Sequence, residues 1–191
     1  MGKSSKALMI LAFVALAGCA GTRSGGDLFK DPAMDFGSIQ TVAVMPFQNL
    51  SREQVAAERV RDVFMTRLMA TGGIYVLPPG EVARGIGIVG IQNPTAPSPE
   101  EMKKLAGIIK VNGVITGVVD EYGELRSGSA SANMISVSMK LVELQLGKVV
   151  WSAQATKGGV GITDRLFGGG GKPMNDITVQ AVDELIEKLY Q

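Results

Sequence analysis

The stretch TVAVMPFQNLSREQVAAERVRDVFMTRLMATGGIYVL, residues 41–77, decides the fold class of this chain. Its first part, Thr41 to Phe47, is a short apolar run containing Pro46, which is typical of a buried strand that leaves its sheet at the proline. Its last part, Ile74 to Leu77, is a second apolar run. A helix between two such strands predicts a right-handed crossover unit whose strands are parallel.

The middle of the same stretch has helical spacing. Ser51 and Gln54 match the serine and glutamine of a capping box, so we expect Ser51 to cap the helix. The pair Gly72-Gly73 should end it. The apolar residues between these limits predict one buried helical face, formed by Ala56, Val60, Val63, Phe64 and Leu68.

Residues 78–109 divide into two parts. Residues 78–97 are rich in glycine and proline and predict an irregular segment with one helical turn near Glu81 to Arg84. Ser98-Pro99-Glu100-Glu101 then combines an N-cap serine, a proline at the first helical position and a glutamate at the third. A second main helix is therefore expected to begin there.

The rest of the chain predicts three strands and a closing helix. Gly113 to Val119 is a continuous apolar run, and residues 135–142 alternate between apolar and polar side chains, as in a strand with one face on the core. Gly147-Lys148 should turn that strand into a hairpin with Val149 to Ala155. The final helix is expected to open at Asn175-Asp176, and its apolar stripe is Val182, Leu185, Ile186 and Leu189.

These elements follow the order β-α-β-(α)-α-β-β-β-α. Such an order predicts an α/β (α+β) fold, in which a mixed β-sheet is packed by helices. The aromatic side chains of Trp151 and Phe64 are expected to be buried between the sheet and a helix, because each lies on the apolar face of its element.

The N-terminus has the pattern of a signal peptide. Lys3 and Lys6 precede an apolar run from Ala7 to Leu16, which is too short to span a bilayer as a helix. The next residues complete the sequence Leu16-Ala17-Gly18-Cys19, which resembles the lipobox of bacterial lipoproteins. The resemblance implies cleavage before Cys19 and attachment of lipid to its thiol. An ordinary secretory signal followed by a chance cysteine is the alternative.

This interpretation divides the chain into three parts. Residues 1–18 are the predicted signal peptide, residues 19–35 are the lipidated cysteine and a flexible tether, and residues 36–191 form a single periplasmic domain. Cys19 is the only cysteine, so the domain has no internal disulfide. Two or more acyl chains would attach the protein stably to a membrane.

Charge and residue types exclude several functions. The chain has 19 basic and 18 acidic side chains, and removal of Lys3 and Lys6 leaves 17 basic ones, so no strongly basic field remains to recruit nucleic acid. Histidine, the commonest general base and metal ligand, is absent. We therefore predict no enzyme activity and no catalytic, cofactor-binding or metal-binding residues.

Three motifs that suggest ligand sites are better explained without a ligand. Gly85 to Gly90 fits the GxGxxG pattern, but no strand directly precedes it, so an apolar loop is expected. Gly168 to Pro173 lacks the first glycine and the hydroxyl residue of a phosphate-binding loop. Asp120, Glu121 and Glu124 are expected to be solvated loop charges that follow a strand.

The whole pattern resembles a broad group of envelope lipoproteins. The resemblance rests on the lipobox, the strand VAVMPFQNLS, a helix ending in RLMATGG, the strand GVITGVV and a hairpin carrying WSA, and it covers about Ser38 to Tyr190. The group includes the curli-secretion-channel family (CsgG-like), activators of penicillin-binding proteins (LpoB-like) and proteins with the TolB N-terminal fold. It implies a non-enzymatic protein that binds envelope protein partners or forms a homo-oligomer, in secretion or envelope assembly.

Location and role follow from the same resemblance. Ala20 after the lipidated cysteine favours the outer membrane, on its periplasmic side. Activation of a peptidoglycan synthase is an alternative role, although it would need a longer tether than sixteen residues. A small-ligand-binding or enzymatic domain with an unrecognised site is another.

One further segment is a candidate contact with a partner. Arg165, Leu166 and Phe167 lie between two glycine clusters, which deny the segment regular structure at low cost. These residues would either cover the sheet edge as a plug or become ordered on a neighbouring subunit, a partner or the lipid surface.

Overall fold

The computed structural model describes residues 28–127, 130–159 and 171–191, and this part of the chain contains one seven-stranded sheet. The strands are β1 (Leu28–Lys30), β2 (Thr41–Val44), β3 (Gln48–Asn49), β4 (Tyr75–Val76), β5 (Gly113–Ser127), β6 (Ala130–Glu143) and β7 (Lys148–Gly158).

The sheet is mixed. Its order is β1-β7-β6-β5-β2-β4, and β3 pairs with β5 beyond the end of β2. Pairing is parallel between β2 and β4, β2 and β5, and β3 and β5, and it is antiparallel among β5, β6, β7 and β1. The predicted parallel strands of the first crossover, the predicted hairpin of β6 with β7 and the mixed α+β class are confirmed.

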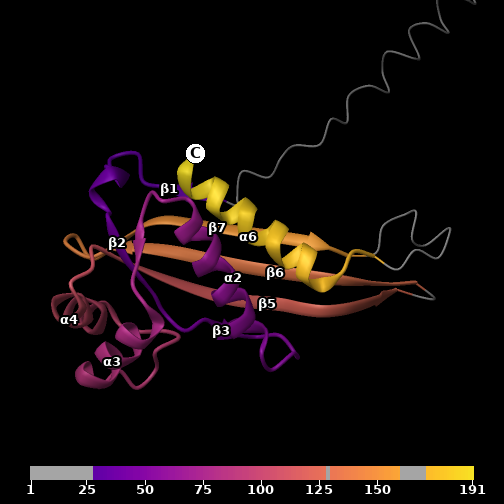
Figure 1. Ribbon diagram of the computed structural model, residues 1–191, viewed down its shortest axis with the longest axis horizontal. Helices are drawn as coiled ribbons and strands as arrows, with labels where there is room; N and C mark the ends of the chain where they lie inside the picture. Colours follow the sequence, from indigo (N-terminus) through magenta and orange to yellow (C-terminus); the bar gives the residue numbers. More distant parts are fainter. Residues whose placement is uncertain (1–27, 128–129, 160–170) are drawn as a thin grey trace, which may run out of the picture.

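Helices cover both faces of this sheet (Figure 1). α2 and α6 lie side by side on one face, whereas α3 and α4 lie together at one end of the sheet. A 3-10 helix, η1, leads into β2. The helices of the described residues are η1 (Phe36–Ser38), α2 (Ala56–Ala70), α3 (Pro79–Val89), α4 (Pro99–Ile109) and α6 (Met174–Tyr190).

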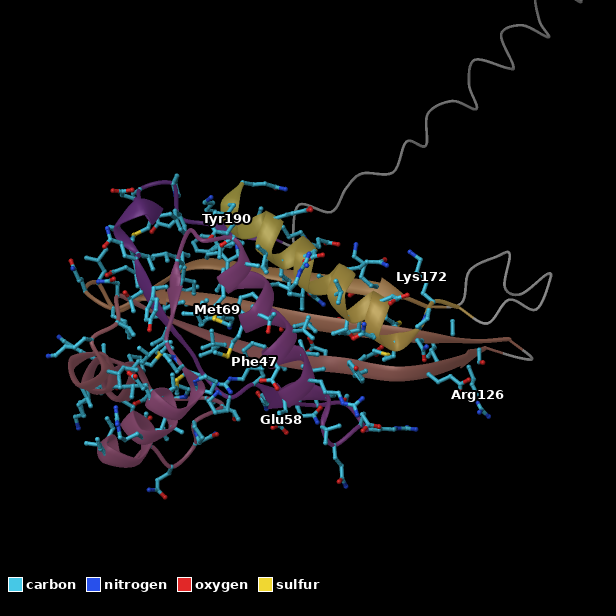
Figure 2. All side chains as sticks on the ribbon, viewed as in Figure 1. Phe47, Glu58, Met69, Arg126, Lys172 and Tyr190 are labelled. Atoms are coloured by element: carbon cyan, nitrogen blue, oxygen red, sulfur yellow. The ribbon has the colours of Figure 1, made fainter. Side chains whose placement is uncertain are left out.

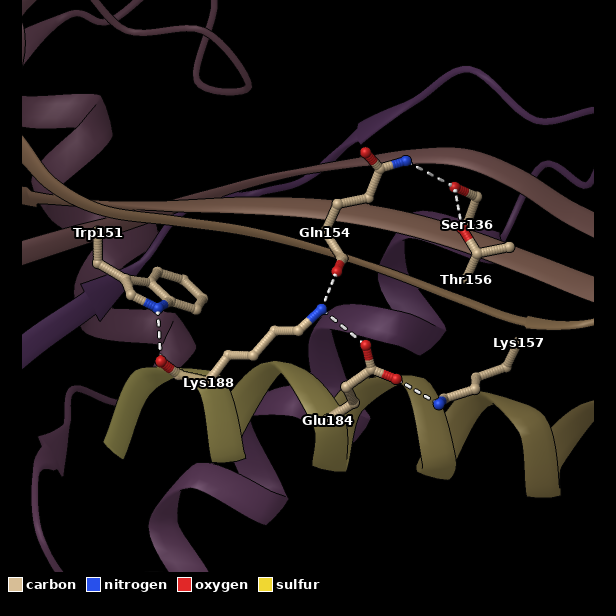
Figure 3. A network of polar contacts seen from close by, with 7 residues as sticks. All are labelled: Ser136, Trp151, Gln154, Thr156, Lys157, Glu184 and Lys188. Atoms are coloured by element: carbon tan, nitrogen blue, oxygen red, sulfur yellow. Dashed lines mark hydrogen bonds and ion pairs between the residues drawn. The ribbon is translucent and has the colours of Figure 1, made fainter. Parts of the chain in front are cut away.

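The larger core lies between the sheet and the pair α2 and α6. Trp151 and Phe64 are both fully buried in it, as predicted. The indole nitrogen of Trp151 donates a hydrogen bond to the Lys188 carbonyl oxygen at 3.1 Å, which ties β7 to α6 (Figure 3). The apolar stripe of α6 is buried as expected, so the closing helix completes this core.

A smaller core lies beneath α3 and α4. α4 begins as predicted, because the Ser98 hydroxyl accepts the Glu101 N–H and the Glu101 carboxylate accepts the Ser98 N–H. Gly85 of α3 faces α4 at close range: a methyl group there would lie 2.5 Å from Ile109 and 2.7 Å from Leu105. The glycine therefore lets the two helices approach each other.

The structure corrects the interpretation of residues 78–97. Most of this segment is the eleven-residue helix α3, and the GxGxxG pattern lies within α3 and at its end, not in a loop. Pro79 stands at the start of the helix, where its missing N–H costs nothing, and Gly90 ends it with φ of 76°. Pro79 and Gly90, two of the residues that predicted irregularity, thus mark the boundaries of a helix.

The predicted start of α2 is also wrong. The helix begins at Ala56, its N-cap is Val55, and no side chain caps it. The Ser51 hydroxyl instead donates to the side-chain oxygen of Asn49 at 2.7 Å. Ser51 therefore belongs to the turn between β3 and α2. The capping-box pattern marked a loop that precedes the helix by one turn.

The sheet includes residues that precede the predicted domain boundary at residue 36. Leu28–Lys30 form the edge strand β1, which pairs with Trp151 to Ala153 of β7. Asp31 forms an ion pair with Lys148 at 2.6 Å, and the Lys30 ammonium lies 4.6 Å from the centre of the Phe36 ring. This part of the predicted tether therefore belongs to the sheet.

Candidate functional site

The candidate site lies where β5 extends beyond its neighbours. β5 and β6 pair along their whole length, from Gly113 opposite Glu143 to Ser127 opposite Ala130. On the other side of β5, β3 pairs only with Val118 and Val119. Within the described residues, β5 from Glu121 onward therefore has a strand on one side only.

This extension corrects a prediction from the sequence. Asp120, Glu121 and Glu124 do not follow the strand as loop charges, because all three lie within it. The sequence around these charged residues has no apolar run, so it did not predict a strand. Pairing with β6 nevertheless keeps the chain extended there. Their side chains are exposed or half-buried, so they remain solvated as expected.

Pro46 and Asn49 explain why the first strands leave β5. Proline cannot donate a hydrogen bond to a neighbouring strand, and β2 ends two residues before it. Asn49 then turns the chain: its side-chain oxygen accepts the Ser51 N–H at 3.0 Å, and its amide nitrogen donates to the Glu53 carbonyl oxygen at 2.8 Å. The loop of residues 50–53 consequently stands beside the free edge of β5.

Two irregularities shape that edge. The register of β5 against β6 shifts between Val119 and Glu121, so Asp120 is the extra residue of a bulge. The Asp120 carboxylate accepts a hydrogen bond from the Ser138 hydroxyl at 3.4 Å. Gly123 has φ of 138°, a backbone conformation that favours glycine. The strand is bent just where it passes the loop.

A groove of about 780 Å³ separates the loop from the strand edge. Arg126 lies near the distal end of β5, on the opposite side of the strands from α6 in Figure 2. The residues that line the groove are Leu50, Ser51, Arg52, Glu53, Asp120, Glu121, Tyr122, Gly123, Glu124, Leu125, Arg126 and Met134.

The groove combines exposed apolar side chains with an excess of carboxylates. Leu50 is 59% exposed and Leu125 is 43% exposed, so the groove presents two apolar side chains to solvent. Four of the lining side chains are acidic and two are basic. Arg126 and Glu124 form an ion pair at 3.0 Å. A hydrogen bond from Ser131 and then this guanidinium hold the pKa of Glu124 below its ordinary value, so the carboxylate stays charged.

These residues offer a binding surface, with no visible catalytic arrangement among them. In residues 28–127, 130–159 and 171–191 there is no group of three acidic, cysteine or histidine side chains that could hold a metal ion. No helix in the same ranges is long and apolar enough to cross a membrane. What the groove presents is an open strand edge, two leucines and a negative net charge.

A smaller hollow of about 250 Å³ lies between the start of α4 and the turn from β6 to β7. Leu146, which is 67% exposed, lines it. The neighbouring Glu143 is buried and accepts the N–H groups of Gln145 and Leu146, both at 2.7 Å, so this turn is held by a carboxylate. We assign no role to the hollow.

The residues that the sequence singled out as sites lie elsewhere. The lipidation site Cys19 and the lipobox residues Leu16, Ala17 and Gly18 fall outside the described residues, and so do the possible contact residues Arg165, Leu166 and Phe167. Both predictions stand as predictions. Sequence analysis missed the groove, because its walls come from segments seventy residues apart; the one available signal was the cluster of acidic residues around residue 120.

The fold and the groove define a class: a single-sheet α+β domain with a charged, open interaction surface at one strand edge. Within that class the chain belongs to the family whose model is described as "Putative lipoprotein GNA1162-like", which matches residues 34–185. A comparison with curated protein sequences finds no match.

Solved structures share this fold at low sequence identity. Lipoprotein GNA1162 from Neisseria meningitidis is 21% identical, with a TM-score of 0.57 over 79% of this chain and 98% of that chain. The PelC dodecamer from Paraburkholderia phytofirmans is 15% identical, with a TM-score of 0.56 over 84% and 95%. The LpoB C-terminal domain from Salmonella enterica is 12% identical, with a TM-score of 0.50 over 66% and 87%.

These comparisons bear on the resemblance seen in the sequence. The relation to lipoproteins and to the LpoB fold is confirmed by the family and by the structural likeness. None of the comparisons tests the likeness to the curli-secretion-channel family. At such identities the structural likeness establishes a shared fold and nothing about partners.

Proposed function

We propose that this chain is a non-enzymatic lipoprotein of the cell envelope that acts by binding another protein or by self-assembly. Lipid on Cys19 would hold it at the periplasmic side of the outer membrane. The observation that carries the proposal is the groove beside β5, which exposes Leu50 and Leu125 at an unpaired strand edge. An open strand edge is a template on which another chain can pair.

The family supports the lipoprotein assignment, and one neighbour supports self-assembly. The family model describes lipoproteins, and the PelC structure of the same fold is a dodecamer. A membrane-held domain with an open edge suits an accessory that recruits a partner or forms a ring.

Activation of a peptidoglycan synthase is the alternative, and the LpoB fold favours it. An activator anchored at the outer membrane would have to reach the inner membrane. Because β1 begins at Leu28, only residues 20–27 separate Cys19 from the sheet. Nine residue steps span at most about 30 Å. This short connection argues against the activator and for a partner close to the anchoring membrane.

Site-specific crosslinking in intact cells tests the proposal. A photo-crosslinking amino acid in place of Leu125 should yield discrete protein adducts, whose identification separates self-assembly from a foreign partner. The same amino acid in place of Ile88, which is 62% exposed on α3, is the matched control and should yield few adducts. Equal adducts from both positions, or none from Leu125, would contradict a role for the groove.

A further inference from the structure

We infer that the groove beside β5 binds an extended, basic peptide segment by adding it to the sheet as a further strand. This inference rests on the proposed function and names the class of partner that the groove would take.

The first reason is the unpaired backbone of β5. Within the described residues, the last backbone hydrogen bond on its outer side runs from the Leu50 N–H to the Val119 carbonyl oxygen, at 2.9 Å. From Glu121 to Arg126 the strand pairs with β6 alone in the described structure. Six residues of strand are about 20 Å long. Their outward N–H and C=O groups form a template on which another strand can pair.

The second reason is the space beside that backbone. The loop of residues 50–53 stands off from the strand, and the groove between them measures about 780 Å³. Binding sites for small ligands have volumes of about 300–1,000 Å³. An added strand lies about 4.8 Å from its neighbour, so it fits alongside β5 with the loop as the opposite wall. Asn49 holds that wall in place through four hydrogen bonds.

The third reason is the chemistry of the lining. Arg126 is already paired with Glu124, which leaves the carboxylates of Glu53, Asp120 and Glu121 against one guanidinium, that of Arg52. A segment that alternates basic and apolar side chains would meet these carboxylates and the exposed Leu50 and Leu125. An acidic segment would be repelled.

The same charges argue against a second copy of this edge as the occupant. If two copies of β5 paired with each other, the carboxylates of Glu53, Asp120 and Glu121 from both copies would be brought together at one interface. Like charges placed opposite one another destabilise strand pairing. Charged side chains on a free edge commonly prevent edge-to-edge association. A basic segment from another protein avoids this repulsion.

Peptide binding to the full, lipidated protein in neutral detergent provides the test. The probe is a fluorescein-labelled peptide of alternating lysine and valine, about seven residues long. It should bind, and the affinity should fall as salt is raised from about 50 to 200 mM. The same peptide with alternate backbone nitrogens methylated cannot donate to β5, and it should bind at least about tenfold more weakly.

Variants of the protein locate the binding. The double variant Glu53→Lys with Glu121→Lys should weaken binding at least about tenfold, because it replaces two carboxylates that face the peptide. Glu187→Lys, a single charge reversal of the same kind at an exposed position of α6, should leave binding unchanged. Hydrogen–deuterium exchange of the β5 amides from Glu121 to Arg126 should slow when the lysine–valine peptide is bound.

Three results would overturn strand addition. The methylated peptide could bind as tightly as the unmethylated one, or Glu187→Lys could weaken binding as much as the double variant does. The peptide could also bind without slowing hydrogen–deuterium exchange in β5. A symmetric dimer that the peptide dissociates would show that a second copy occupies the edge. If crosslinks at Leu125 in cells persist while the peptide results fail, the groove binds a protein in another way and only this inference is lost. If both fail, the proposed function is lost as well.

Discussion

Arg61 is the charged side chain that α2 holds against the end of β2. Its guanidinium is half-buried and donates to the Val44 carbonyl oxygen at 2.7 Å and to the Met45 carbonyl oxygen at 3.0 Å. Burial lowers the pKa of Arg61 from its ordinary value, although Asp62 and Glu58 act the other way. These contacts satisfy two carbonyl groups at the point where the chain turns away from the sheet.

Replacing Arg61 should therefore destabilise the domain. Arg61→Leu leaves the two carbonyl groups without this donor, and an unsatisfied buried polar group costs about 1–3 kcal/mol. The free energy of unfolding from urea denaturation should fall by that amount. Arg59→Leu, an exposed position on the same helix, is the control. An equal loss in the two variants would show that the carbonyl contacts contribute little.

Gly147 and Gly158 both have positive φ but differ in the space around them. Gly158 ends β7 with φ of 84°, and a methyl group added there would overlap the Asn133 carbonyl oxygen. Gly147, in the turn before β7, has φ of 66° but open space around it. Gly147→Ala should cost about 1–2 kcal/mol from backbone strain alone. Gly158→Ala should lower the melting temperature clearly further, and similar shifts would show that the strand end relaxes freely.

At the scale of elements, α6 is fastened to β7 by a polar network above the apolar core (Figure 3). Glu184 forms ion pairs with Lys157 and, at 2.7 Å, with Lys188. The Lys188 ammonium also donates to the Gln154 carbonyl oxygen at 2.7 Å. Burial opposes ionisation of Glu184, but the hydrogen bonds from the two lysines outweigh it, so its pKa lies below the ordinary value of 4.5.

This shift predicts how stability depends on pH. A carboxylate whose pKa is lower in the folded chain stabilises the fold fully above its unfolded value, and this contribution is lost as the pH falls through the folded value. The wild type should therefore be more stable than Glu184→Gln at about pH 7, and the difference should shrink as the pH falls below 4.5 through the lowered folded value. Thermal unfolding of both proteins across that range measures it. Glu187→Gln is the control, and a difference that stays constant with pH would contradict the prediction.

Elements whose boundaries depend on residues within one helical turn could be predicted from the sequence. Ser98 and Glu101 cap α4 as expected, because both partners of the capping box lie within one turn. At Ser51 the same pattern failed, since the Asn49 side chain competes for the serine hydroxyl. α3 was hidden because its glycines suit both a loop and a close helix contact. The Ser51 case was decided by a side chain two residues away. The α3 case was decided by a tertiary contact with α4, which local sequence does not report.

The groove could not be predicted for a related reason. The sequence does not show where β2 and β3 stop pairing with β5, since this depends on register between segments seventy residues apart. The continuous apolar part of β5 ends at Val119, while pairing with β6 carries the strand on to Ser127. The buried positions of Trp151 and Phe64, by contrast, follow from simple periodicity and are confirmed.

In the whole molecule, the first described strand, β1, and the groove beside β5 lie on opposite sides of the antiparallel part of the sheet. The described chain begins at β1, on one edge, whereas the groove lies beside β5, with β7 and β6 between them (Figure 1). Three strand spacings separate the two by about 14 Å. Lipid attached just ahead of β1 would leave the β5 edge free for a partner. This arrangement requires that Cys19 carries the lipid.

Removing the thiol of Cys19 tests that requirement. Each buried CH₂ of an acyl chain contributes about 0.8 kcal/mol to membrane binding, so two or more chains hold a protein of this size stably. Cys19→Ser should abolish labelling by a fatty-acid analogue and leave the protein either soluble after export or retained with its signal peptide. Thr22→Ala, which leaves the lipobox intact, should keep both the label and membrane association. If Cys19→Ser is still labelled, the lipid is attached elsewhere, and neither the short connection to β1 nor the orientation of the groove can be inferred from this cysteine.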